Sequence, residues 1–160
     1  MFVVDGYNAI RRVPRFAVVE ARDGLRAGRD ALVTAILASG TLRVQPVVII
    51  FDGSEDTGVG LRAPHPKLTL RFSRSPDNAD QEILRFLGKG SAGAATVITA
   101  DQDLAFESRR LGATVVAPES WNILKLPKRP KRKSHEARSE KPNASASDVA
   151  YWLDVFEDES

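Results

Sequence analysis

The chain opens with Met1-Phe2-Val3-Val4-Asp5-Gly6-Tyr7-Asn8-Ala9-Ile10, in which a short apolar run ends at a carboxylate, a glycine and an asparagine. The pattern recurs in Val47-Val48-Ile49-Ile50-Phe51 before Asp52-Gly53, and in Ala95-Thr96-Val97-Ile98, which leads into Asp101-Gln102-Asp103. Such runs are typical of buried strands. If the three strands are parallel, their carboxylates gather at the edge where open α/β sheets bind ligands.

The whole chain has the composition of a globular protein. Its 160 residues and 42% hydrophobic content suit one domain with a core of its own. The absence of Cys excludes disulfides and thiolate metal sites, and with only His65 and His135 a histidine-rich zinc site is not expected. No apolar run approaches the roughly 18–20 residues that span a bilayer, and we see no signal peptide. We therefore expect a cytoplasmic protein that does not enter a membrane.

Charge divides the chain into three parts. Residues 1–124 carry 15 Lys and Arg against 14 Asp and Glu, residues 125–147 carry 8 against 2, and residues 148–160 carry 0 against 5. We therefore expect a folded domain over 1–124, a basic low-complexity linker over 125–147 and an acidic amphipathic helix and tail over 148–160. The linker could bind RNA or simply be solvated. The acidic helix could pack on its own domain, dock on a partner or compete with RNA for the linker.

Hydrophobic periodicity predicts further elements. Three longer helices are expected, the first between an Asp23 cap and Gly40, the second between Asn78 and Gly88, and the third between Asp101 and Gly112, and Pro118 is expected to open a short one. Strands are expected over 68–72 and 114–116, and loops over 11–15 and 53–66. The inward faces of the first and third helices are expected to include Leu25, Leu37 and Leu111. The alternation predicts an α/β sandwich with a mostly parallel sheet and helices on both faces.

Five acids are candidates for a functional cluster: Asp5, Asp52, Asp80, Asp101 and Asp103. Gathered at one edge, they would repel one another and raise their own pKa values unless a cation lay among them. Without Cys or clustered His, a hard, oxygen-seeking ion such as Mg²⁺ or Mn²⁺ fits best, and such sites usually serve phosphate chemistry. Each acid also has a structural explanation as a helix cap or turn residue. That explanation is weakest for Asp5, because a carboxylate ending a buried strand needs a partner.

Residues beside these acids have open roles. Asn8 could hold Asp5 or a ligand through its amide, or cap a helix. Thr99 could bond an aspartate or cap the following helix. Gly6 is expected to allow a tight turn or a close approach of the backbone to substrate. Tyr7 is expected to pack rather than to stack on a ligand.

Three motifs together resemble the YacP-like branch of NYN domains, within the PIN-like nucleases. They are Asp5-Gly6-Tyr7-Asn8 after the first strand, Asn78-Ala79-Asp80-Gln81-Glu82-Ile83, and Val97-Ile98-Thr99-Ala100-Asp101-Gln102-Asp103-Leu104. Residues 48–53 also resemble the second strand of that family and its end. The resemblance covers roughly residues 1–124.

This resemblance implies a PIN-like three-layer sandwich and a Mg²⁺- or Mn²⁺-dependent ribonuclease, in which metal-activated water attacks an RNA phosphodiester in line. It implies that Asp5, Asp80 and Asp101 are catalytic and bind metal, that Asp103 is a further ligand, and that Asn8, Asp52 and Thr99 support them. RNA is the expected partner, and RNA associated with the ribosome is one form that it could take. The residues expected to meet phosphates are Arg11, Arg12, Arg15, Arg71, Arg74, Lys128, Arg129, Lys131, Arg132 and Lys133.

Two other functions are compatible with these residues. A binding module for RNA or the ribosome could keep the fold without catalysis, although acids would repel phosphate. A small phosphohydrolase could use Asp5 as a nucleophile, but Tyr7 stands where such an enzyme has a second aspartate.

Overall fold

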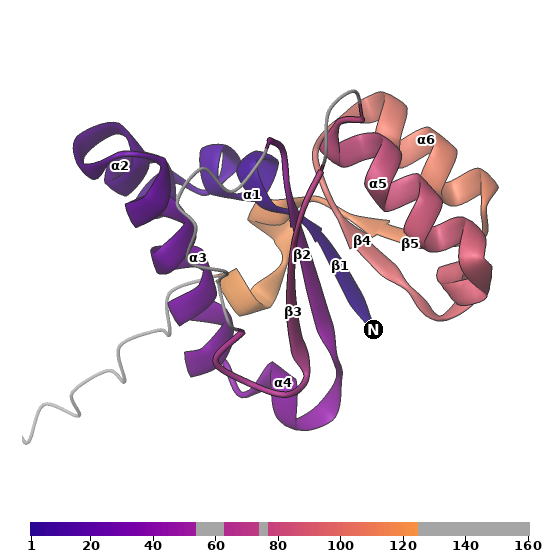
Figure 1. Ribbon diagram of the computed structural model, residues 1–160, viewed down its shortest axis with the longest axis horizontal. Helices are drawn as coiled ribbons and strands as arrows, with labels where there is room; N and C mark the ends of the chain where they lie inside the picture. Colours follow the sequence, from indigo (N-terminus) through magenta and orange to yellow (C-terminus); the bar gives the residue numbers. More distant parts are fainter. Residues whose placement is uncertain (54–62, 74–76, 125–160) are drawn as a thin grey trace, which may run out of the picture. The chain divides into compact units, whose positions relative to one another are not determined.

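Five parallel strands form one sheet in the computed structural model, which describes residues 1–53, 63–73 and 77–124 (Figure 1). The strand order is β3-β2-β1-β4-β5. The strands are β1 (Phe2–Asp5), β2 (Val47–Phe51), β3 (Leu68–Phe72), β4 (Thr96–Ile98) and β5 (Thr114–Val116). The sheet is therefore wholly parallel, where a mostly parallel one was expected.

The central strand β1 explains why the apolar runs lack polar alternation. Val3 pairs with Val48 of β2 on one side and with Val97 of β4 on the other. Val3 and Val4 are fully buried, because a parallel sheet with helices on both faces hides every side chain of its inner strands. β2 is likewise buried along its whole length.

Helices cover both faces of the sheet, as Figure 1 shows. On one side lie α1 (Gly6–Arg12), α2 (Pro14–Asp23), α3 (Leu25–Ala38) and α4 (Thr41–Val44), and on the other α5 (Ala79–Phe86) and α6 (Gln102–Arg110). Four short helical turns complete the described chain: η1 (Leu87–Ser91), η2 (Ala92–Ala94), η3 (Pro118–Ser120) and η4 (Asn122–Leu124).

Strand alternation splits the core in two. Val4, Ile49 and Phe51 pack with the α1–α3 side, whereas Val3 and Ile50 pack with the α5–α6 side. Successive strand residues point to opposite faces, so each strand supplies both cores. The result is the predicted three-layer α/β sandwich.

Two local predictions at the start of the chain are wrong. Residues 11–15 are not a loop, because Pro14 occupies the first turn of α2, where the missing N–H of proline costs nothing. Asp23 does not cap a helix either: it ends α2 and binds Arg22. Gly24, with φ of 90°, joins α2 directly to α3.

Three leucines expected in the core are partly exposed. The exposed fractions are 49% for Leu25, 37% for Leu37 and 43% for Leu111. Leu25 and Leu37 lie at the ends of α3, and Leu111 lies just past α6.

Several predictions concern residues outside the described ranges. They are most of the 53–66 loop, Arg74, the linker over 125–147 with its Lys128, Arg129, Lys131, Arg132 and Lys133, and the acidic helix over 148–160. In the described part of the chain, every helix is too short or too polar to span a bilayer.

Candidate active site

The sheet reverses its winding between β1 and β4. From β1 the chain builds outward through β2 and β3 on one side, and through β4 and β5 on the other. At such a switch point the loops leaving the two strands diverge and open a crevice at their carboxyl ends. A cavity of about 680 Å³ lies there. It is lined by Asp5, Tyr7, Asn8, Arg11, Arg12, Leu25, Arg29, Asp52, Gly53, Asn78, Ala79, Asp80 and Asp101.

Asp5 is the most deeply buried of these acids, with 7% of its surface exposed. Its Oδ1 accepts from the backbone N–H of Asn8 (3.4 Å), which makes Asp5 the N-cap of α1, and its Oδ2 accepts from the Thr99 hydroxyl (2.9 Å). Burial raises the pKa of Asp5 to about 6, and the charges of Asp80 and Asp101 add to the rise, although the two hydrogen bonds oppose it. Asp5 therefore caps α1, and its ionised form is destabilised by burial and by the neighbouring carboxylates.

Thr99 and Asn8 brace the β4–α6 loop against β1. Thr99 donates to Asp5 and accepts from the backbone N–H of Asp101 (3.1 Å). The Asn8 side-chain oxygen accepts from the backbone N–H of Ala100 (2.8 Å). Thr99 thus bonds an aspartate, one of its two expected roles. Asn8 contacts Asp5 through its backbone only, and its side chain holds the loop that carries Asp101.

Asp80 and Asp101 occupy helix starts. Asp101 caps α6 by accepting from the N–H of Leu104 (2.9 Å), and Asp80 lies in the first turn of α5. The pKa of Asp80 is raised by partial burial and then by the nearby charges of Asp101, Asp52 and Asp103. Both acids therefore have the structural role that helix starts favour and face the cavity as well.

Asp52 and Asp103 are more peripheral. Asp52 lines the cavity but is exposed, and its Oδ1 accepts from the Ser73 hydroxyl (2.8 Å). Asp103 is exposed and does not line the cavity, although its charge reaches Asp80. We call Asp5, Asp52, Asp80 and Asp101 the acidic wall.

The acidic wall lacks a basic counterion among the residues that the structure describes. None of its carboxylates forms an ion pair there, and the charges that shift Asp5 and Asp80 are other carboxylates. Within the same ranges, no three Asp, Glu or His side chains lie close enough together to hold one metal ion. The donor chemistry suits a hard cation, but the carboxylates would have to move closer together to share it.

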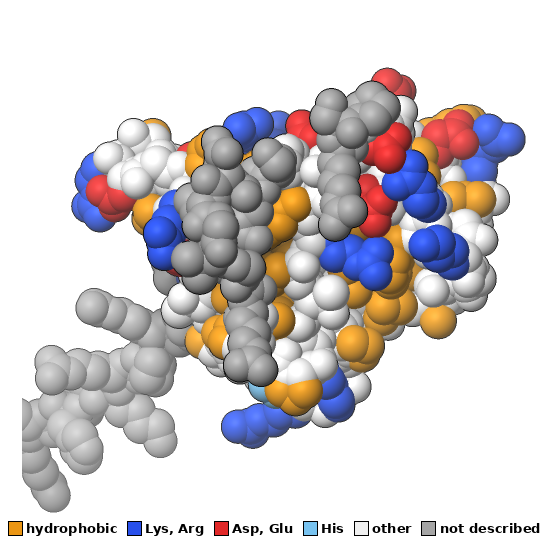
Figure 2. All heavy atoms as spheres, in the orientation of Figure 1, with side chains coloured by type: hydrophobic (Ala, Val, Ile, Leu, Met, Phe, Trp, Pro, Cys, Tyr) orange, Lys and Arg blue, Asp and Glu red, His pale blue; other side chains and the backbone are white. Residues whose placement is uncertain are grey.

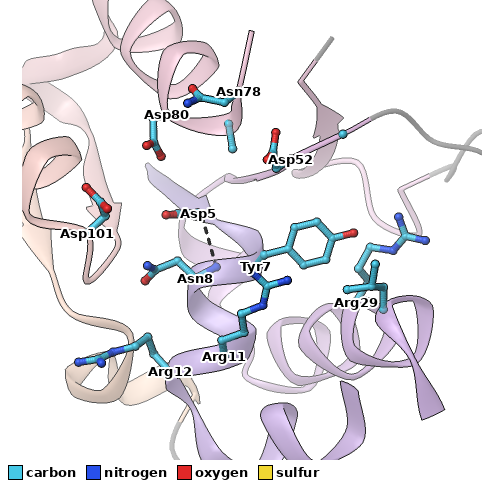
Figure 3. Close-up of a pocket in the computed structure, with 13 residues that line it drawn as sticks. Asp5, Tyr7, Asn8, Arg11, Arg12, Arg29, Asp52, Asn78, Asp80 and Asp101 are labelled. Carbon is cyan, nitrogen blue, oxygen red and sulfur yellow. Dashed lines mark hydrogen bonds between the residues drawn. The ribbon is translucent and has the colours of Figure 1, made fainter. Parts of the chain in front are cut away.

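Three arginines line the side of the cavity opposite the acids (Figure 3). We call Arg11, Arg12 and Arg29 the arginine wall. In Figure 3, Arg11 and Arg12 lie below Asn8 and Arg29 lies beside the Tyr7 ring, while Asp52, Asp80 and Asp101 lie above Asn8. Arg11 and Arg12 were expected to meet phosphate. Both have weak surface partners: Arg11 contacts Glu20 at 3.5 Å, and Arg12 contacts Glu119 at 2.8 Å.

Arg29 of α3 lines the cavity and was not predicted from the sequence. Its guanidinium carbon lies 5.4 Å from the Phe72 ring centre and 6.0 Å from that of Phe51. A signal was available, because Arg29 stands three and seven residues before Leu32 and Ile36, in the apolar stripe of α3. A charge in such a stripe points inward and calls for an explanation.

Arg15 and Arg71, the other arginines within the described ranges that were predicted to meet phosphate, do not line the cavity. Arg15 lies over the Phe16 ring at 4.4 Å, and Arg71 pairs with Glu82 at 3.2 Å and lies over Phe86. Basic and acidic side chains are interspersed over α5 and α6 in Figure 2, so the surface charge over these two helices is of mixed sign.

Gly6 and Tyr7 both lie against Phe51 of β2, and Tyr7 also lines the cavity. Gly6 has no positive φ and makes no turn; a Cβ there would collide with the Phe51 ring and lie 3.1 Å from the Ile50 carbonyl. The close contact of Gly6 is thus with the sheet, and the expected approach of its backbone to substrate stays a prediction. Tyr7 packs on Phe51 with 5.2 Å between ring centres, as expected, and also lines the cavity beside Arg11.

Comparison with known proteins gives a consistent family. The model of the YacP-like NYN domain matches residues 2–153, well past residue 124, where the motif resemblance ends. The crystal structure of Rae1 (YacP) from Bacillus subtilis is similar over 98% of this chain and 92% of that one, with a TM-score of 0.63 and 22% identity. Its W164L mutant is similar over 74% and 70%, with a TM-score of 0.56 and 21% identity.

No curated protein matches the sequence. At these identities the solved structures establish the fold, which is PIN-like as predicted. The family match covers nearly the whole chain, and NYN domains are nuclease-like. The chain therefore belongs to the YacP-like NYN domain family.

Proposed function

We propose that the protein is a metal-dependent ribonuclease that hydrolyses RNA phosphodiester bonds at the acidic wall. One observation carries the proposal: carboxylates and arginines line opposite sides of one cavity at the switch point of a nuclease-like fold. Hydrolysis of a phosphodiester needs both kinds of residue, since the negative charge of the phosphate must be bound while a water molecule is brought to its phosphorus. RNA is thus the proposed partner.

Asp5, Asp80 and Asp101 are the residues that would hold Mg²⁺ or Mn²⁺, with Asp103 as an outer acid. Their fit rests on their oxygen donors and on their mutual repulsion, which adds to the effect of burial in raising the pKa values of Asp5 and Asp80 and which a bound cation would relieve. When bound, such an ion polarises a phosphoryl oxygen and lowers the pKa of a bound water.

The chain's own residues bind and orient the substrate. Thr99 and Asn8 fix Asp5 and the loop of Asp101, so the acids stay in place at little cost during the reaction. Arg11 and Arg12 can exchange their exposed ion pairs for substrate phosphates, since such pairs are worth no more than about 1 kcal/mol. In-line attack of water on the phosphorus would then cleave the bond.

The rival function is a binding module for RNA that does not cut it. The acidic wall disfavours this function, because carboxylates without a cation would repel the phosphates that a binder must attract. A phosphohydrolase with Asp5 as nucleophile is disfavoured as well, since Tyr7 stands where such an enzyme has a second aspartate.

The test is cleavage of labelled single-stranded RNA with Mn²⁺, Mg²⁺ or EDTA. Asp5→Asn and Asp80→Asn are compared with Asp30→Asn, which alters an exposed acid of α3 outside the cavity. We expect metal-dependent cleavage that both wall variants lose and the control keeps, with all variants folded by circular dichroism. Cleavage that survives in EDTA or in both wall variants would refute the proposal. RNA that is retained, released by salt and never cut would favour the binding module.

A further inference from the structure

Arg29 differs from the ordinary surface arginines of this chain. Its Nε is buried and has no hydrogen-bond partner among the described residues, and its guanidinium lies over the Phe72 and Phe51 rings. Those rings stack with 5.5 Å between their centres. An arginine held on an aromatic surface has already lost much of its rotamer freedom, so little entropy remains to be lost when it binds an anion.

The position of Arg29 selects the kind of anion. It lines the same cavity as Asp5, Asp80 and Asp101 but lies on the opposite side, with Tyr7 between (Figure 3). A phosphate held at the acidic wall is therefore not the one that Arg29 contacts. A ligand that contacts both walls needs two negatively charged groups joined by a linker. Consecutive phosphates of a polynucleotide strand are such a pair of groups.

Arg11 lies in the same wall of the cavity as Arg29. Its guanidinium carbon lies 5.4 Å from the Tyr7 ring centre, and its only ion pair among the described residues is the long contact to Glu20. Two cations thus flank the Tyr7 ring, on which a nucleobase between two phosphates can rest.

We propose that Arg29, assisted by Arg11, forms a second phosphate site, which binds the backbone phosphate next to the bond cleaved at the acidic wall. This inference rests on the proposed nuclease function. According to this inference, the substrate is a strand with at least two consecutive phosphates. Arg29 is then a substrate-binding residue, and the bound strand crosses the cavity.

The first test measures binding without cleavage. A fluorescent single-stranded RNA of twelve nucleotides is titrated in EDTA against the full chain and against Arg29→Met, which keeps an apolar stem and removes the charge. We expect affinity to fall about 10- to 100-fold. The slope of log affinity against log salt should fall by about 0.7, the value for one phosphate contact on a single strand. Arg29→Lys should recover part of the loss, since it restores charge without the planar fork.

Arg110→Met is the control. Arg110 also lies over a phenylalanine ring, with its guanidinium carbon 6.0 Å from the centre of Phe106, but it does not line the cavity and is not among the residues expected to meet phosphate. Its variant should bind RNA as the unchanged chain does. Equal affinity and salt slope for Arg29→Met and the unchanged chain, or equal losses in Arg29→Met and Arg110→Met, would overturn the proposal.

The second test locates the phosphate. Two RNA trinucleotides each carry one uncharged methylphosphonate linkage, one before and one after the remaining phosphodiester. The unchanged chain should cleave one of them about 10- to 100-fold more slowly than the all-phosphate trinucleotide, by kcat/KM, and Arg29→Met should not distinguish the two. Equal rates on all three by the unchanged chain would overturn the second site. Failure of the unchanged chain to cut any RNA would instead refute the nuclease function, while the binding comparison would still decide whether Arg29 contacts phosphate.

Discussion

The acidic wall and the arginine wall face each other across one cavity but are built in different ways. Asp5 and Asp101 are N-caps that backbone N–H groups hold in place, so the ends of β1 and β4 position them. Arg29 is positioned by its guanidinium, which lies over the Phe51 and Phe72 rings. The acids thus follow from strand topology, whereas Arg29 depends on core packing.

This difference implies different sensitivities. Changes in the backbone at the ends of strands should disturb the acidic wall. Changes at Arg11 and Arg12 should alter binding while the fold keeps its stability, because exposed cations contribute little to it.

The largest effect on stability is expected at Gly6, which follows Asp5 and lies against β2. Gly6→Ala should lower the free energy of unfolding by about 3 kcal/mol or more, since the added Cβ collides with the buried Phe51 ring. Gly88→Ala is the control, because a Cβ there meets nothing within 4 Å. Urea unfolding measures both. An equal, small effect of the two changes would show that β2 can yield, and that Gly6 does not fix the acidic wall.

The next effect has the opposite sign. In EDTA at pH 7.5, Asp5→Asn should raise the free energy of unfolding by up to about 3 kcal/mol, since ionising Asp5 in the folded state is costly. A raised pKa means that the contribution of Asp5 is fully present below its unfolded value, 3.8, and is lost as the pH rises through about 6. The advantage of the variant should therefore shrink toward pH 4. Thermal or urea unfolding from pH 4 to 8 would contradict this if the difference did not vary with pH.

A smaller loss is expected at Asn8. Asn8→Ala removes the acceptor for the Ala100 N–H and should cost about 1–3 kcal/mol, because a partly buried backbone donor loses its partner. RNA cleavage should fall as well, because the loop before Asp101 is loosened. Asn122→Ala, an exposed change, serves as the control. Unchanged stability with reduced cleavage would mean that Asn8 contacts the substrate rather than the loop.

The smallest effect is expected at the rim of the arginine wall. Arg12 and Glu119 form an exposed ion pair at 2.8 Å, and a double-mutant cycle with both alanine variants should give a coupling below about 1 kcal/mol. A coupling well above that value would show that Arg12 is committed to Glu119 and is not available for phosphate.

The acids could be predicted from the sequence because strand ends are visible in it. A run such as Val47–Phe51 followed by Asp52 marks both a strand and its end, and parallel topology brings such ends together. The helical form of residues 11–15 was missed because Pro14 was treated as a breaker, although proline suits the first turn of a helix.

Arg29 and the Asn8 side chain show what sequence patterns do not reveal. The partner of Asn8, the Ala100 N–H, lies 92 positions away, and no local pattern encodes that pairing. The apolar stripe of α3 marked Arg29 as inward-facing, but only the fold shows that the inward direction at that position is the cavity.

The most direct test of the central claim, that the acidic wall is a cation site independent of the arginine wall, is calorimetric titration of Mn²⁺ at pH 7.5. The unchanged chain and Arg29→Met should bind Mn²⁺ with the same affinity, and Asp80→Asn should lose most of it. Equal Mn²⁺ binding by Asp80→Asn and the unchanged chain, or its loss in Arg29→Met, would contradict the account.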